Sequence, residues 1–486
     1  MKRYAPILVL VVLANVLAIA WLLMRQPALE EGETSIGKVL VADNTREAAR
    51  YDLSDRGRDL NVVLVSMDAL RYDSTGISGN TEGLTPNLDA FAEEAVVFHD
   101  AVSAAPWTLP SHMSVWTARW PSVHGVTNKL KLLAQEQMVE TSLSPGIQTY
   151  PDMLIREGWT AAGFTGGAGV QSRYGFGRDF EIYVDDRYFG GMDYSVPSAM
   201  DWLEENRSSR FFMFLHGYDS HGQYELPESV RSSIADYSGT LDGGIEEQAR
   251  FREQGLDAIE NPGDMASLEG ALGPEDTDYL KSVYNLKVRQ ADERLGRFMS
   301  YLRSSGLLEN TVVAVISDHG DEFMEHGGLD HGATLYEEQL HVVMAVRFPG
   351  YARTHDIQET VRTVDLFPTL FDAMGLPPIT GVDGVSLLPL LRGEKLELTA
   401  FAETDYRLYV HHRMLRQGDY KLILDLLDGG RELYNLSADP QEQNDLSSTD
   451  PRRTYEMEQA LRRWMERTRT NPQDYLGVRQ KPIDIF

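Results

Sequence analysis

Short, mostly apolar runs limit most strongly what this chain can fold into. Their β-branched and aromatic residues are typical of strands buried on both faces of a sheet; the runs occupy residues 61–67, 211–215, 311–316 and 342–348. Between them lie segments whose apolar residues recur every three or four positions, as on one face of a helix; these are residues 88–95, 196–206 and 276–304. Strands that alternate with helices predict an α/β fold, with a mostly parallel sheet between layers of helices.

Three of these runs lead directly into side chains that can bind a metal ion. Asp68 follows the first run, His216 the second, and Asp318 and His319 follow Ser317 after the third. In such sheets ligands bind beyond the carboxyl ends of the strands. Carboxylates with imidazole are ligands of Zn²⁺, and carboxylate-rich sites suit Ca²⁺, Mg²⁺ or Mn²⁺. We therefore expect Asp68, Asp318 and His319 to hold a divalent metal ion, although an isolated Asp-His pair would indicate only a polar loop.

Thr108 stands two residues before Pro110, which can occupy the first turn of a helix. A threonine at this place can cap the helix, or it can direct its oxygen at a bound anion or metal. The local sequence alone leaves both interpretations open.

The acidic composition excludes some partners and some chemistry. Lys and Arg number 45 against 74 Asp and Glu, a formal net charge of −29. Because nucleic acids are bound by clustered positive charge, we expect no nucleic-acid partner. The chain has no cysteine, which excludes disulfides, thiolate metal sites and a cysteine nucleophile.

The N-terminal segment predicts a membrane anchor. Residues 5–24 carry no charge, and a helix of that length spans a hydrocarbon core of about 30 Å. Lys2 and Arg3 precede it and acidic residues follow it, so the N-terminus is expected in the cytoplasm and the rest outside, in the periplasm or at the cell surface. The alternative is a cleaved signal peptide, which normally has a shorter apolar region.

The chain divides by composition into four parts. Residues 1–28 form the cytoplasmic N-terminus and the anchor, 29–58 a tether, 59–395 a large domain, and 396–486 a small α+β domain with antiparallel strands. Within the large domain, residues 223–273 are rich in Gly, Asp and Glu and are predicted to form an irregular insertion.

Several spaced motifs, in the same order, resemble those of the sulfatase family within the alkaline phosphatase superfamily. They are residues 61–71 (NVVLVSMDALR), 108–112 (TLPSH), 317–320 (SDHG) and 332–338 (GATLYEE). Residues 418–423 (GDYKLI) and 432–444 (ELYNLSADPQEQN) are similar to the small C-terminal domain of sulfatases. The resemblance implies an alkaline-phosphatase-like sheet and a metal-dependent enzyme acting on an anionic ester.

The resemblance also implies roles for single residues. Asp68, Thr108, Asp318 and His319 would hold the catalytic metal, with Thr108 at the nucleophile position. The chemistry agrees, because metal coordination lowers the pKa of a hydroxyl that is otherwise a poor nucleophile. In-line attack would give a covalent Thr108 ester, which water then hydrolyses.

Three histidines are further candidates. Residues 216–222 (HGYDSHG) resemble the histidine loop of lipid phosphoethanolamine transferases, which binds phosphate or a second metal. His331 falls where the family has a Lys or His beside the leaving group. His216, His221 and His331 are therefore candidates for a second metal or for the substrate anion, and His221 and His331 for catalysis. The alternative is that they are histidines at helix ends or on the surface.

The chain departs from the family at three points. Sulfatases convert a Cys or Ser at the nucleophile position to formylglycine, but Thr108 stands there and no cysteine is present. His112 replaces the arginine that closes the nucleophile motif, and the Lys-x-His segment that grips sulfate is missing near residues 163–170. Because an alkoxide nucleophile suits phosphoryl transfer, we expect a phosphate ester before a sulfate ester.

The expected function is thus a membrane-anchored, metal-dependent hydrolase of a phosphate ester. One alternative is a transferase that moves a phosphorus-containing head group to a surface lipid or glycan. Another is a true sulfuric ester hydrolase. A catalytically silent binding protein is the third, and the intact set of Asp68, Thr108, Asp318 and His319 argues against it.

Overall fold

The computed structural model describes residues 39–40, 53–133, 137–222, 272–351, 355–408 and 410–470, together with residues 234, 237, 239 and 241. The predicted anchor, most of the tether and most of the insertion at 223–273 lie outside these residues. None of the helices in the described part is both long enough and apolar enough to cross a membrane.

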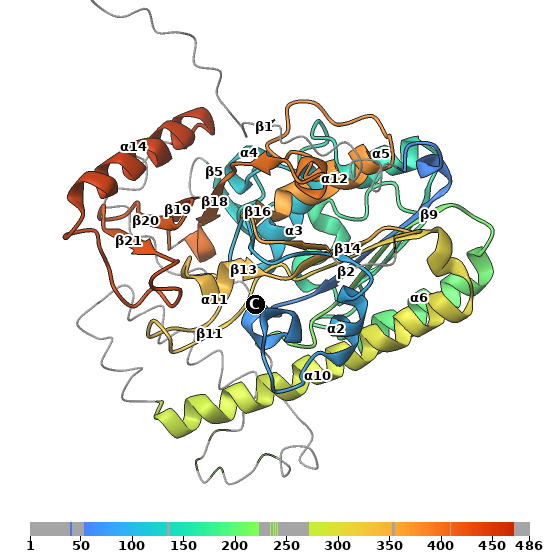
Figure 1. Cartoon of the computed structure of the whole chain (residues 1–486), viewed down its shortest axis with the longest axis horizontal. Helices are drawn as coiled ribbons and strands as arrows, with labels where there is room; N and C mark the ends of the chain where they lie inside the picture. The colour runs from blue at the N-terminus through green and yellow to red at the C-terminus, as the bar shows by residue number, and fades with distance from the viewer. Residues whose placement is uncertain are drawn as a thin grey trace, which may run out of the picture. The chain divides into compact units, whose positions relative to one another are not determined.

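An eight-stranded sheet organises the fold, with the strand order β15-β3-β14-β10-β2-β9-β7-β8 (Figure 1). Five neighbouring strands run parallel: β10 (Thr311–Ile316), β2 (Asn61–Met67), β9 (Phe211–Gly217), β7 (Thr160–Phe164) and β8 (Ile182–Val184). Three further strands complete the sheet: β14 (Met344–Arg347), β3 (Val96–Phe98) and β15 (His355–Ile357). β14 runs antiparallel to both β10 and β3, and β15 runs parallel to β3. The mostly parallel sheet predicted from the sequence is confirmed.

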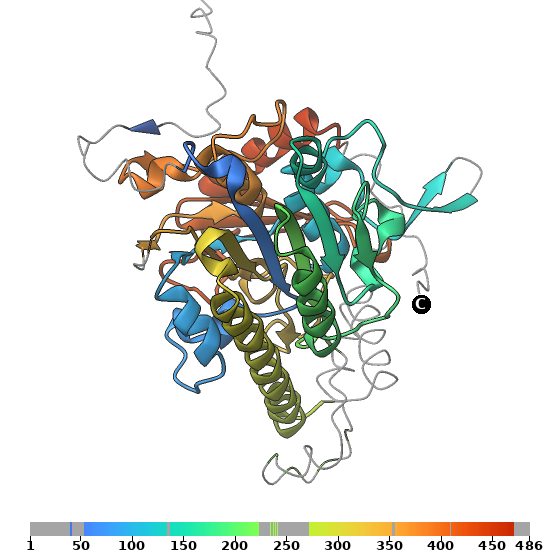
Figure 2. The same cartoon turned by 90° about the vertical axis from the view of Figure 1, so that its right-hand side faces the viewer.

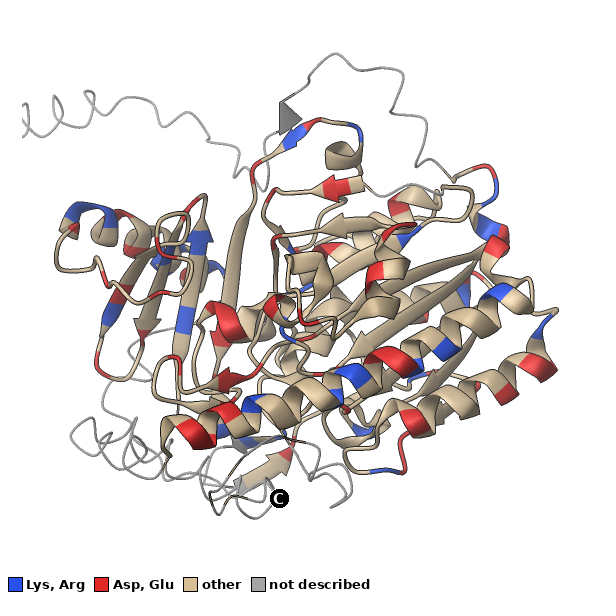
Figure 3. Cartoon of the chain, turned by 60° about the horizontal axis from the view of Figure 1, so that its bottom comes forward, with Lys and Arg blue, Asp and Glu red and all other residues tan. Residues whose placement is uncertain are grey.

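Helices cover both faces of this sheet (Figure 2). One face carries α3 (Thr108–Thr117), α5 (Tyr150–Arg156) and α12 (Leu366–Ala373). The other carries α2 (Pro86–Ala92), α6 (Met192–Asn206) and α10 (Pro274–Ser304). The predicted patterns at 196–206 and 276–304 lie within α6 and α10, whereas the pattern at 88–95 extends three residues beyond the end of α2. Val62 of β2 packs into the first core and Val63 into the second, as the alternation of a strand requires. The outer surface of α10 carries interleaved acidic and basic residues (Figure 3).

The register of the parallel strands brings the predicted ligands to one edge of the sheet. Ser66 of β2 pairs with Ile316 of β10 on one side and with His216 of β9 on the other. Asp68 lies two residues beyond Ser66, and Asp318 lies two residues beyond Ile316. The two carboxylates therefore leave the sheet level with each other, at its carboxyl edge.

The C-terminal part forms a separate antiparallel sheet of β18 (Thr399–Thr404), β19 (His412–Gln417), β20 (Tyr420–Asp425) and β21 (Arg431–Asn435). Helix α14 (Pro451–Arg467) packs on it, which agrees with the α+β character predicted for this part. Trp120 of the larger part lies in the same apolar core as Leu422 of β20 and Trp464 of α14. The boundary between residues 395 and 396 stays a prediction.

Short elements complete the described part. The strands are β1 (Val39–Leu40), β4 (Ala101–Val102), β5 (Leu130–Leu133), β6 (Gln137–Glu140), β11 (Glu322–Phe323), β12 (Leu329–Asp330), β13 (His341–Val342), β16 (Val361–Arg362) and β17 (Lys395–Leu396). The helices are α4 (Pro121–His124), α11 (Glu337–Leu340) and α13 (Leu388–Leu391).

Candidate active site

The predicted metal ligands Asp68, Asp318 and His319 meet at the carboxyl edge of the sheet. The Nε2 atom of His319 lies 3.4 Å from Oδ2 of Asp318 and 3.7 Å from Oδ1 of Asp68. All three side chains are fully buried. One ligand atom from each lies within 4.8 Å of the others, so a single cation can contact all three.

The surroundings of these atoms fit a divalent cation. Among the described residues, Oδ1 of Asp68 and Oδ2 of Asp318 have no hydrogen-bond partner, although both atoms are buried. Burial raises the pKa of Asp68, and the neighbouring Asp318 raises it further. A cation would offset the cost of burying two adjacent carboxylates, which is high when nothing positive lies between them.

His319 presents the correct nitrogen to such a cation. Its Nδ1 donates a hydrogen bond to the carbonyl of Gly320 at 2.9 Å, which leaves the lone pair on Nε2. Burial lowers the pKa of His319 to about 4, so the imidazole is neutral at ordinary pH. A neutral imidazole is the form that binds metal.

Thr108 is the first residue of α3 and does not cap it. Trp107 occupies the N-cap position, and no side chain caps this helix end. The Oγ1 atom of Thr108 instead lies 3.5 Å from Nε2 of His319. Of the two interpretations that the sequence left open, the structure therefore favours an oxygen that faces the candidate metal site.

Hydrogen bonds fix α3 relative to these ligands. The ring of His112 contacts Oγ of Ser66 through Nε2 at 2.8 Å and the carbonyl of Thr108 through Nδ1 at 2.9 Å. The hydroxyl of Ser111 donates to the carbonyl of Asp318 at 2.8 Å. His112 thus ties the helix to β2, and Ser111 ties it to the residue that follows β10.

The two histidines of the 216–222 loop take different places. Nε2 of the fully buried His216 lies 3.1 Å from Oδ2 of Asp68, and its Nδ1 lies 3.5 Å from the backbone nitrogen of Gly166. His216 therefore orients a candidate ligand. His221 lies in the pocket above Thr108, where its ring packs edge-on against the ring of His331, with the centroids 4.7 Å apart.

His331 is held by two carboxylates. Its Nδ1 lies 2.6 Å from Oδ1 of Asp321 and 2.5 Å from Oδ1 of Asp330. Its ring lies over that of His319, with the centroids 4.2 Å apart. His319, Asp321 and His331 form a second group that could hold a cation. Asp321 directly follows the 317–320 motif, and its contact with His331 follows only from the fold.

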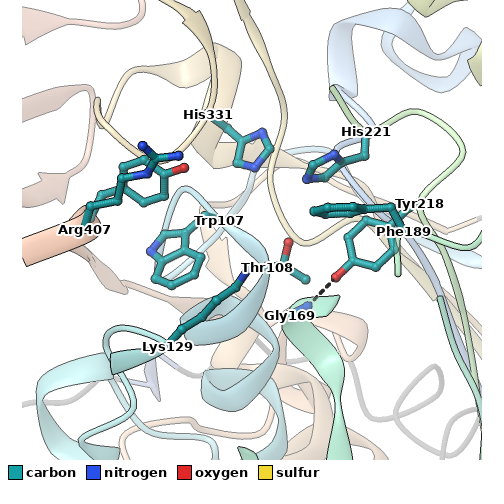
Figure 4. A pocket seen from close by; sticks show the side chains of 10 residues that line it. Trp107, Thr108, Lys129, Gly169, Phe189, Tyr218, His221, His331 and Arg407 are labelled. Carbon is teal, nitrogen blue, oxygen red and sulfur yellow. Dashed lines mark hydrogen bonds between the residues drawn. The ribbon is translucent and has the colours of Figure 1, made fainter. Parts of the chain in front are cut away.

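A pocket opens above Thr108 (Figure 4). Its aromatic lining residues are Trp107, Phe189, Tyr218 and Tyr406. Its basic or titratable lining residues are Lys129, His221, His331 and Arg407. Gly169 completes the lining, and none of the described residues that line this pocket is Asp or Glu. Lys129 and Arg407 come from separate segments with no motif, and sequence reasoning missed them.

Strained backbone borders this pocket. Ala168, Phe189, Asp330 and Arg407 have positive φ angles of 47°, 62°, 78° and 53°. Residues with a β-carbon rarely adopt this conformation, and it persists where the surrounding structure enforces it, often at functional sites. Each of the four lines the pocket or precedes a residue that does.

The sulfatase family model matches residues 60–376, which contain the whole of the metal-ligand set. The chain belongs to the sulfatase family. A second model, described as the C-terminal part of N-sulphoglucosamine sulphohydrolase, matches residues 324–471. The family resemblance stated from the motifs is confirmed, and with it the assignment as a sulfatase-family hydrolase.

Curated relatives of this chain match along most of their length. Arylsulfatase K of Rattus norvegicus is 24% identical over 459 residues, which cover 83% of this chain and 77% of the relative. Delta 4,5-hexuronate-2-O-sulfatase of Bacteroides thetaiotaomicron is 23% identical over 424 residues, which cover 81% of this chain and 85% of the relative.

A solved structure of a phosphonate monoester hydrolase shares the fold of this chain. The phosphonate monoester hydrolase of Agrobacterium radiobacter superposes with a TM-score of 0.66 at 18% identity. The match covers 84% of this chain and 96% of that one. At this identity the likeness shows the fold and leaves the substrate open.

Proposed function

We propose that this sulfatase-family chain hydrolyses a phosphate ester, with Thr108 as the nucleophile. The observation that carries the proposal is the position of the Thr108 hydroxyl on the pocket wall, 3.5 Å from Nε2 of His319. Asp68, Thr108, Asp318 and His319 would hold a divalent metal ion, which when bound lowers the pKa of the hydroxyl and offsets the charge of the substrate.

Thr108 and His331 divide the chemical work. The hydroxyl of Thr108 gives up its proton to solvent and Oγ1 forms a bond to phosphorus, while the bond from phosphorus to the alcohol oxygen breaks. His331 gives the leaving alcohol its proton from Nε2, because Asp321 engages the other ring nitrogen. Water then cleaves the Thr108 phosphoester, which releases phosphate and restores the hydroxyl.

Phosphate is proposed before sulfate because of the residues at the nucleophile and around it. Thr108 is neither Cys nor Ser, so the conversion to formylglycine has no substrate at this position. The segment where the family has its Lys-x-His places Gly169 against Thr108 in this chain. The fold shared with a phosphonate monoester hydrolase is compatible with phosphorus chemistry.

A sulfate ester is the second candidate, because both curated relatives are named as sulfatases. A panel of phenyl phosphate, diphenyl phosphate, phenyl phosphonate monoester and phenyl sulfate, run on the full chain with metal analysis, separates the two. We expect phenyl phosphate to be turned over faster than phenyl sulfate. A preference for the sulfate would overturn the phosphate assignment and establish the second candidate.

Two variants test the nucleophile. Thr108→Ala should lower kcat by at least a thousandfold, whereas Thr108→Ser keeps a hydroxyl and should retain measurable turnover. Peptide mass spectrometry after rapid acid quench should find the phosphoryl group on residue 108. Full activity in Thr108→Ala would end this assignment. Equal release of alcohol and free phosphate supports hydrolysis, whereas alcohol released with phosphate attached to an acceptor would show a transferase.

We also propose that residues 5–24 anchor the chain in a membrane, with the catalytic part outside the cytoplasm. The support is the uncharged run of 20 residues behind Lys2 and Arg3. The chain should stay with membranes after an alkaline wash and should be cleaved by protease added to intact cells or spheroplasts. If the chain is recovered in the alkaline wash, or is protected from the added protease, the proposal is contradicted.

A further inference from the structure

One wall of the pocket is positively charged in a strongly acidic protein. The chain has a formal net charge of −29, yet Lys129 and Arg407 line the pocket and no described lining residue is Asp or Glu. Figure 4 shows the Lys129 side chain pointing toward Thr108, with Arg407 farther along the same wall, beyond Trp107. Two cations in a recessed site concentrate anions there, because the low-dielectric walls focus the field.

The fold holds both cations in place through one side chain. Asn128 accepts a hydrogen bond from the backbone nitrogen of Arg407 at 3.1 Å, and its amide donates to the carbonyl of Asp405. Lys129 is the next residue after Asn128. Arg407 is only 5% exposed and has a φ of 53°, so the chain buries a guanidinium on a strained turn. Such preorganisation at a cost in backbone energy is typical of binding sites.

Aromatic rings connect Arg407 to the nucleophile. The guanidinium carbon of Arg407 lies 5.5 Å from the ring centroid of Tyr406, and Tyr406 packs edge-on against Trp107, with the centroids also 5.5 Å apart. Trp107 immediately precedes Thr108. Across the pocket, Phe189 stacks at an angle on His221, with the centroids 4.8 Å apart. Aromatic walls of this kind suit a flat ring, and such a ring would place its ester at Thr108 and its far side toward Arg407.

Building on the proposed function, we propose that the alcohol portion of the substrate carries a second oxyanion, which Arg407 binds with help from Lys129. The preferred substrates are therefore ring esters whose ring bears a carboxylate or another anionic group. A guanidinium suits this role because it can donate two parallel hydrogen bonds to one oxyanion. Lys129, closer to Thr108, also attracts the ester group itself.

Matched ester pairs test the proposal. The full chain is assayed on 3-carboxyphenyl phosphate against phenyl phosphate, and on the corresponding pair of sulfates. The wild type should show a kcat/KM at least tenfold higher for the carboxylated member, and Arg407→Gln should bring this ratio close to one. Arg407→Lys keeps a charge and should retain part of the ratio. Arg452→Gln removes an equivalent charge from an arginine whose side chain is 88% exposed, and should leave the ratio unchanged.

A binding measurement keeps this test separate from the proposed function. Calorimetry compares 3-hydroxybenzoate, the alcohol product, with phenol. The wild type should bind 3-hydroxybenzoate at least tenfold more tightly, and Arg407→Gln should lose that advantage. If Arg407→Gln does not fold, the variant Lys129→Gln serves instead, because Lys129 is partly exposed. It should raise the Kd for 3-hydroxybenzoate by at least threefold. Equal binding of the two alcohols by the wild type, or an advantage that survives both variants, overturns the proposal. Selective binding without turnover of any ester would overturn only the proposed hydrolysis.

Discussion

Gly169 lies directly against Thr108: a β-carbon at position 169 would stand 2.8 Å from Cβ of the threonine and 2.9 Å from its Cγ2. Contacts below 3.0 Å force a displacement. The backbone nitrogen of Gly169 also donates to the hydroxyl of Tyr218 at 2.8 Å, so the glycine has little room to withdraw. The missing side chain at 169 therefore sets where the hydroxyl of Thr108 can lie.

Gly169→Ala should lower kcat by at least tenfold and leave KM nearly unchanged. The added methyl group pushes Thr108 aside, and a misplacement of about 1 Å can cost about a hundredfold in rate. Steady-state kinetics on phenyl phosphate, or on the best ester of the panel, provide the measurement. Gly146→Ala is the matched control, because an added β-carbon there meets only Oγ of Ser144 at 3.9 Å. An unchanged kcat in Gly169→Ala would show that the contact does not position the hydroxyl.

Removal of divalent metal should destabilise the fold as well as stop turnover. A cation bound only by the folded state at a hundredfold excess over its Kd contributes about 2.7 kcal/mol. Its loss also leaves Asp68 and Asp318 side by side, where burial and the charge of Asp318 both disfavour ionisation of Asp68. A chelator should therefore lower the Tm of the wild type by several degrees and that of Asp318→Asn much less. Equal shifts in both proteins would place the bound metal elsewhere.

The candidate metal ligands could be grouped from the sequence because each one lies within three residues of the end of a buried strand. The prediction that Asp68, Asp318 and His319 lie together required only the rule that parallel strands present their carboxyl ends at one edge of the sheet. The capping of α3 was ambiguous, because the helix begins at Thr108 itself and local sequence does not resolve a shift of one residue.

The substrate side of the pocket could not be predicted in the same way. Lys129 and Arg407 are far apart in the sequence, and Asn128 joins them only after the C-terminal sheet has docked on the large domain. Gly169 has an ordinary sequence context, and its role depends on the close approach of α3. Residues that act through tertiary contact leave no periodic or spaced signal in one sequence.

Asp321 should matter most for esters whose alcohol is a poor leaving group. It contacts Nδ1 of His331 at 2.6 Å, beside Asp330 at 2.5 Å, and so helps to fix which ring nitrogen faces the substrate. In Asp321→Asn, kcat/KM should fall at least tenfold for an alkyl ester and less than threefold for a 4-nitrophenyl ester, because only the alkyl alcohol needs a proton to leave. The measurement is the slope of log kcat/KM against the pKa of the leaving alcohol, which should be steeper in Asp321→Asn than in the wild type. Parallel losses for both esters would mean that Asp321 has only a structural role.

Lys421 should be essential for the attachment of the C-terminal sheet. Its fully buried ammonium lies 2.9 Å from Oε1 of Glu337 in α11 and 2.9 Å from Oε1 of Glu442. Lys421→Met leaves the buried Glu442 without its cation and Glu337 with Arg416 alone, which should cost about 3–5 kcal/mol in the free energy of unfolding. Chemical denaturation measures the cost, with the exposed Lys395→Met as control. A cost below about 1 kcal/mol would mean that Glu337 and Glu442 find other partners.

The pair of His326 and Glu338 should make the stability of the loop between β11 and α11 depend on pH. Burial alone would lower the pKa of His326, but the hydrogen bond from its Nδ1 to Oε1 of Glu338, at 2.6 Å, and the charges of Glu338 and Glu322 raise it to about 9. Because the folded pKa lies above the unfolded value of about 6.5, this stabilisation is complete below pH 6.5 and is lost as the pH rises through 9.

Glu338→Gln isolates this contribution. The difference in unfolding free energy between the wild type and Glu338→Gln should be about 1–2 kcal/mol near pH 6, once solvent screening is allowed for, and should shrink steadily between pH 6.5 and 9. Urea denaturation at half-unit steps of pH gives the curve, and titration of the His326 ring by NMR gives its pKa directly. A difference that stays constant across this range would show that the imidazole does not carry the charge. The ring also stacks on Tyr336, with the centroids 3.6 Å apart, but this contact is kept in Glu338→Gln and therefore cancels in the difference.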